Sequence, residues 1–116
     1  MTYAELKRVF LVKSAAIRPA WWGRVCGKKI SDKLRGDVWA AVVEGWPEDG
    51  SKVQAARNAK LILRTRYGID PITLLLIGAI IQIAVNVIWG WLKQRWDERH
   101  KELLAWQRML LGNTQP

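Results

Sequence analysis

The sequence predicts an all-α protein with three short basic amphipathic helices followed by one long helix, about residues 71–111, that spans a membrane and projects as an amphipathic stalk. Two observations predict this class. Residues 1–66 hold fourteen Lys/Arg and six Asp/Glu, whereas the twenty-two residues 71–92 hold no charged side chain. As a helix, that uncharged stretch would be about 33 Å long, which matches a hydrocarbon core of about 30 Å.

Local signals predict the three short helices. Thr2 and Glu5 have the spacing of a capping box, which predicts a helix from about Tyr3. The second helix begins near an Asp or Ser cap and ends at a Gly-x-Pro sequence, and the third begins after a Ser cap and ends at a glycine. The expected helices therefore cover about residues 3–16, 32–45 and 52–67.

The fourth helix has a clear beginning and no early end. Asp70 is a suitable N-cap, Pro71 suits the first helical position, and no helix breaker follows until Gly112. Apolar and small residues recur at alternate steps of three and four, a coiled-coil spacing that continues beyond the uncharged stretch. This stripe needs a partner, which is either another copy of the chain or one of the three short helices.

The expected organisation has three parts. Residues 1–67 form a basic helical part at the membrane surface, residues 68–92 the transmembrane span, and residues 93–116 an amphipathic stalk and tail. Four residues at the end of the span have the composition of a membrane interface, with aromatic rings followed by cations: Trp89, Trp91, Lys93 and Arg95. The predicted location is a single-pass protein of a bacterial inner membrane or a virion-associated membrane. The excess of cations before the span favours an N-terminal part on the cytoplasmic or interior side.

A helix–helix interface is predicted along the long helix. Small residues and carboxamides step by four along one side of the span, where they suit close approach and interhelical hydrogen bonding in lipid. Aromatic and aliphatic residues continue the same stripe in the stalk. The predicted interface residues are Gly78, Gln82, Asn86, Gly90, Trp96, Leu103, Trp106 and Leu110, and the expected partners are further copies of the chain or other membrane helices.

A basic cluster precedes the span. The chain has 19 Lys/Arg against 10 Asp/Glu, a formal charge of +9, so it favours anionic partners. Arg57, Lys60 and Arg64 share one face of the third helix, and Arg66 follows them. These four residues are predicted to contact lipid headgroups of a bilayer or nucleic acid.

No catalytic, cofactor or metal site is predicted. The lone Cys26 and the lone His100 have no base or second ligand at a suitable spacing, and the carboxylates are scattered. Trp21 and Trp22 are expected in an ordered or membrane-touching loop. The protein is therefore predicted to be non-enzymatic, with no cofactor and no small-molecule substrate.

The expected function is that of a self-associating anchor or assembly component. Compact, tryptophan-rich, basic single-span chains of this size resemble in type those of bacteriophage virions and lysis cassettes. Two alternatives stay open. One is a small oligomeric pore former of the holin kind, in which Gln82 and Asn86 line the pore. The other is a basic helical module that contacts nucleic acid and buries its apolar helix in a soluble oligomer.

Overall fold

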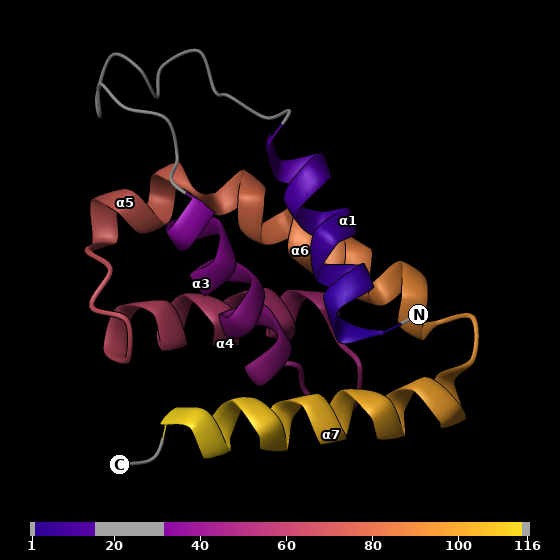
Figure 1. Cartoon of the computed structure of the whole chain (residues 1–116). Helices are drawn as coiled ribbons and strands as arrows, with labels where there is room; N and C mark the ends of the chain where they lie inside the picture. Colours follow the sequence, from indigo (N-terminus) through magenta and orange to yellow (C-terminus); the bar gives the residue numbers. More distant parts are fainter. Residues whose placement is uncertain (1, 16–31, 115–116) are drawn as a thin grey trace.

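The computed structural model describes residues 2–15 and 32–114, and these residues fold into a bundle of six helices (Figure 1). The all-α class is confirmed, and the first three described helices closely match the predicted ranges. Trp21, Trp22 and Cys26 lie outside the described residues. The helices are α1 (Tyr3–Ala15), α3 (Asp32–Glu44), α4 (Lys52–Thr65), α5 (Pro71–Leu76), α6 (Gly78–Leu92) and α7 (Trp96–Thr114).

The predicted helix starts are confirmed by their capping hydrogen bonds. The Thr2 hydroxyl accepts from the Glu5 backbone N–H at 3.2 Å, and the Ser51 hydroxyl accepts from the N–H of the third residue after it, also at 3.2 Å. Asp70 accepts from the hydroxyl of Thr73 at 2.6 Å and from its N–H at 3.0 Å. These bonds from Thr73 hold the pKa of Asp70 below its usual value.

Helix α6 forms the centre of the bundle. It packs against α1, α3 and α4, while α7 runs across the far end of α3 (Figure 1). Ile81, Val85 and Ile88 of α6 are fully buried, as is Trp39 of α3, whose ring stacks on Phe10 of α1 at a centroid distance of 5.3 Å. The apolar sequence of α6 is therefore explained by its contacts with the other helices of the same chain.

The single long helix predicted for residues 71–111 is wrong, because the chain breaks it twice. The first break is at Ile77, where φ is −95° and ψ is 9°. Gly78 follows, and a glycine inside a helix costs about 1 kcal/mol relative to alanine. The Ile77 carbonyl accepts hydrogen bonds from the N–H groups of Ile80 and Ile81, which are the first hydrogen bonds of α6. Helix α6 therefore begins directly after α5, and the two helices are joined by a bend at Ile77.

The second break, at residues 93–95, contains neither Gly nor Pro. Here the chain reverses and brings α7 back against the bundle (Figure 1). Arg99 of α7 donates a hydrogen bond to the Trp91 carbonyl at the end of α6. The Trp91 and Trp106 rings stack at 4.7 Å with an interplanar angle of 18°, and Leu103 is 1% exposed. The reversal lets one chain bury an apolar stripe that an extended stalk would leave in water.

The predicted membrane span is also wrong. Among the residues that the structure describes, no helix combines the length and the apolar character that a bilayer crossing requires. Helix α6 has 15 residues, which is about 22 Å of helix against a hydrocarbon core of about 30 Å. This finding overturns the transmembrane, single-pass and membrane-location predictions. Trp91, expected in an interfacial belt, is instead buried within the chain at 6% exposure.

The turn between α3 and α4 positions the start of α7. Gly50 has φ +73°, and its N–H donates to the Pro47 carbonyl at 3.1 Å. A Cβ at Gly50 would lie 2.4 Å from the Trp96 ring, so the ring packs directly on the turn backbone. Further along α7, the Gln107 amide donates two hydrogen bonds of 3.0 Å, to the carbonyls of Val43 and Trp46. Helix α7 thus contacts both the end of α3 and the turn that follows it.

Candidate functional site

The packing of α4 against α3 decides which side of α4 is exposed. Four residues of α4 face the bundle, and three of them are small: Ala55, Ala56, Ala59 and Leu63. The two helices approach closely, since a Cβ on Gly45 would lie 2.9 Å from the Asn58 Cβ. The Asn58 amide also donates a hydrogen bond of 2.7 Å to the Gly45 carbonyl. This contact fixes the rotation of α4 about its axis.

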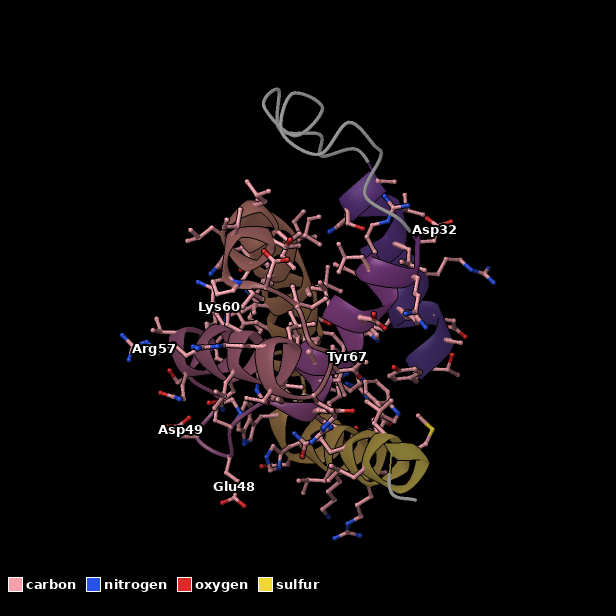
Figure 2. The ribbon with its side chains drawn as sticks, turned by 90° about the vertical axis from the view of Figure 1, so that its left-hand side faces the viewer. Asp32, Glu48, Asp49, Arg57, Lys60 and Tyr67 are labelled. Atoms are coloured by element: carbon pink, nitrogen blue, oxygen red, sulfur yellow. The ribbon has the colours of Figure 1, made fainter. Side chains whose placement is uncertain are left out.

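The opposite side of α4 carries the three cations that the helical spacing predicted. Arg57, Lys60 and Arg64 are exposed, and steps of three and four residues place them on one side of the helix. Figure 2 shows Arg57 and Lys60 extending outward from the bundle. Val53, at 65% exposure, and Leu61, at 59%, lie on the same side. We call these five residues the basic face.

The basic face carries charge of one sign. Helix α4 contains four Lys/Arg and no Asp/Glu, whereas α1, α3 and α7 contain both signs. The ion pairs found within the described part of the chain involve other cations, namely Arg35, Arg66 and Arg95. Because the three cations form no ion pair with a carboxylate of the described residues, we expect this face to attract anions.

Arg66, predicted in the same cluster, has a different role. Its guanidinium donates to the carboxylate of Glu44 at the end of α3. The Glu44 side chain is 2% exposed, and its Oε1 has no hydrogen-bond partner among the described residues. Burial raises the pKa of Glu44, and Arg66 opposes that rise. Arg66 therefore joins α3 to α4 and is not part of the basic face.

Sequence reasoning missed the partly buried polar cluster around Glu44. Burial raises the pKa of Tyr67, and the nearby carboxylates of Glu44 and Asp37 raise it further. Burial likewise raises the pKa of Tyr3, whose ring lies 5.4 Å from the Trp106 ring. Residues of this cluster are far apart in the sequence, so spacing alone could not have found them.

The residues of the predicted helix–helix interface occupy two environments. Gln82 and Asn86 are exposed, and Gly78 and Gly90 are partly exposed with open space where a Cβ would be. Their role in contacts with another chain stays a prediction, and so does the lining of a pore by Gln82 and Asn86. The stalk residues pack against the chain's own core or are buried in it: Trp96, Leu103, Trp106 and Leu110.

The predicted interfacial residues are likewise divided. Trp89 is partly buried, with its ring 6.4 Å from that of Trp96. Lys93 and Arg95 are exposed, and Arg95 lies 3.6 Å from the Glu98 carboxylate. These residues belong to the turn before α7 and the contacts around it.

The described residues contain no group of three His, Cys, Asp or Glu side chains placed to bind a metal ion. His100 instead stacks on Trp96, with ring centroids 5.1 Å apart. The basic face therefore remains the best candidate for a functional site. No family model matches the chain, and no curated protein or solved structure is significantly similar to it.

Proposed function

We propose that the protein is a helical module that binds the phosphate backbone of nucleic acid through the basic face of α4. The single observation that supports this proposal is the set of three exposed cations on one helix face, none of which forms an ion pair with a carboxylate of the described residues. Arg57, Lys60 and Arg64 are separated by about 4.5 and 6 Å along the helix axis at 1.5 Å per residue. Such a row can contact successive phosphates of one strand.

The composition of α4 favours duplex backbone contacts over base recognition. An exposed helix fits the major groove of B-DNA, and phosphate contacts position a protein without reading sequence. Proteins that bind single strands usually stack bases on aromatic side chains, and α4 contains no aromatic residue. We therefore expect binding with little sequence preference and a strong dependence on salt.

The test measures the affinity for a labelled duplex of about 20 base pairs by fluorescence anisotropy over a salt series. Three phosphate contacts predict a slope of log K against log salt of about −2.7, or about a fortyfold loss of affinity between 50 and 200 mM salt. Replacing one contacting cation should make the slope shallower by about one. Lys60→Gln is the variant of choice because the Lys60 side chain is exposed and makes no ion pair with any described residue.

The matched control is Arg108→Gln. Arg108 is an exposed cation of α7, so this change removes the same charge from a different face. The proposal predicts that Arg108→Gln leaves the slope unchanged. An equal effect of the two variants would show that net charge, and not the basic face, drives binding. Absence of duplex binding at 50 mM salt would refute the proposed function.

A further inference from the structure

A groove runs along α6 on the side that faces α1. It consists of two adjoining hollows of about 270 and 340 Å³, which share Lys13, Asn86 and Val87. The α6 residues that line it extend from Ile83 to Trp91, a distance of about 12 Å at 1.5 Å per residue. The larger hollow lies at the lower end of the volume range of small-molecule sites. The groove therefore suits a narrow, elongated ligand.

The groove has an apolar floor. Leu6 of α1 and Val87 of α6 are nearly buried beneath it, and Val9 is half-buried at its side. Gly90 contributes no side chain, and a Cβ there would meet no atom within 4 Å. An aliphatic chain lying in this groove would remove apolar surface from water, which stabilises the bound state in proportion to the area covered.

Among the described residues, both charged groups that line the groove are positive. Lys13 and Arg99 line the larger hollow together with the carboxamides of Asn86 and Gln94, and no carboxylate of the described residues lines either hollow. The Arg99 guanidinium is held in place, since its Nη1 donates to the Gln94 Oε1 at 3.1 Å and its Cζ lies 5.4 Å from the Trp91 ring centroid. A guanidinium has five N–H donors, so Arg99 has donors beyond those used by Nη1.

We propose that this groove binds a small amphipathic anion, namely a carboxylate at the end of a linear aliphatic chain. The carboxylate lies between Lys13 and Arg99 in the larger hollow, where the two cations complement its charge. The aliphatic chain follows α6 toward Ile83, where Val87 and its neighbours provide apolar contact. This site is on a different surface from the basic face of α4 and does not depend on the proposed nucleic-acid function.

Isothermal titration of the full chain with decanoate tests the proposal. Decanoate should bind with one molecule per chain, whereas acetate and decyltrimethylammonium, which lack the chain or the negative charge, should not. Lys13→Gln should weaken binding by about tenfold to a hundredfold, as expected for the loss of one charge-assisted hydrogen bond. The matched control is Arg8→Gln, since Arg8 is an exposed cation of α1 that does not line the groove.

A second pair of variants tests the groove itself. Gly90→Leu should fill the groove and abolish decanoate binding, while Gly78→Leu, at another open glycine of α6, should leave it unchanged. Lys60→Gln on α4 should also leave decanoate affinity unchanged, which separates this site from the basic face. The proposal is overturned if decanoate does not bind, if decyltrimethylammonium binds equally well, or if Arg8→Gln weakens binding as much as Lys13→Gln. If Gly90→Leu does not fold, the comparison of Lys13→Gln with Arg8→Gln decides.

Discussion

Replacing Leu103 with alanine tests whether α7 packs against the bundle of its own chain. Leu103 is 1% exposed and belongs to the common hydrophobic core. Truncation of a buried leucine to alanine costs about 2–5 kcal/mol, because it loses apolar burial and leaves a cavity. For a chain of this size, a loss of about 3 kcal/mol lowers Tm by about 12 °C. Thermal unfolding followed by circular dichroism measures this shift.

The matched control is Met109→Ala on the same helix. Met109 is 44% exposed, so its truncation should change stability by no more than about 0.5 kcal/mol, or about 2 °C in Tm. Equal shifts for Leu103→Ala and Met109→Ala would contradict the position of α7 in the bundle.

Protein concentration separates packing within the chain from packing between chains. A contact within one chain gives a Tm that is independent of concentration, whereas a helix buried only against a second copy gives a Tm that rises with concentration. We expect the Tm of the unmodified chain to stay constant over a tenfold range. A clear rise would mean that the stripe of α7 is buried by self-association, as one interpretation of the sequence allowed.

Changes at four further positions should alter stability in directions that the structure sets. Gly36→Ala should stabilise the protein by about 0.5–1 kcal/mol in urea unfolding, since the added Cβ would meet no atom within 4 Å. Gly45→Ala should destabilise it in the same assay, because the added Cβ would lie 2.9 Å from the Asn58 Cβ. Ser51→Ala should cost about 1 kcal/mol through loss of the α4 cap, and Ser51→Thr should restore most of it in the same assay. The raised pKa of Glu44 means that its contribution to stability is complete below the ordinary value of 4.5 and is lost as pH rises through the folded-state value. As the pH rises through this pKa, the Glu44→Gln variant should therefore gain stability relative to the unmodified chain. If the free energies of unfolding of the two proteins changed with pH in parallel, this prediction would be contradicted.

The sequence was sufficient to predict features that depend on neighbouring residues. Thr2, Ser51 and Asp70 were expected to cap helices, and each accepts the expected hydrogen bond from a backbone N–H three residues later. Such bonds form within one turn, so their signals are local. The three cations of the basic face were also expected together, because helical periodicity alone places them on one side.

The breaks in the long helix could not be predicted in the same way. Residues 93–95 contain no helix breaker, and the reversal there is stabilised by Arg99 on the Trp91 carbonyl and by the stacking of Trp91 on Trp106. Uncharged residues in a continuous run are compatible with lipid or with a protein core, and periodicity does not distinguish these environments. The ion pair of Arg66 could not be predicted for a related reason, since its partner Glu44 lies 22 residues away.

Position 50 must satisfy two separate requirements: its backbone has a positive φ, and the Trp96 ring leaves no room for a Cβ. Asparagine tolerates a positive φ better than most residues, but its Cβ would still collide with the indole. Among homologues, glycine should therefore persist at this position wherever a tryptophan occupies position 96. Asparagine at position 50 should occur only together with a smaller residue at position 96, a paired substitution that would identify distant relatives sharing this reversal of the chain.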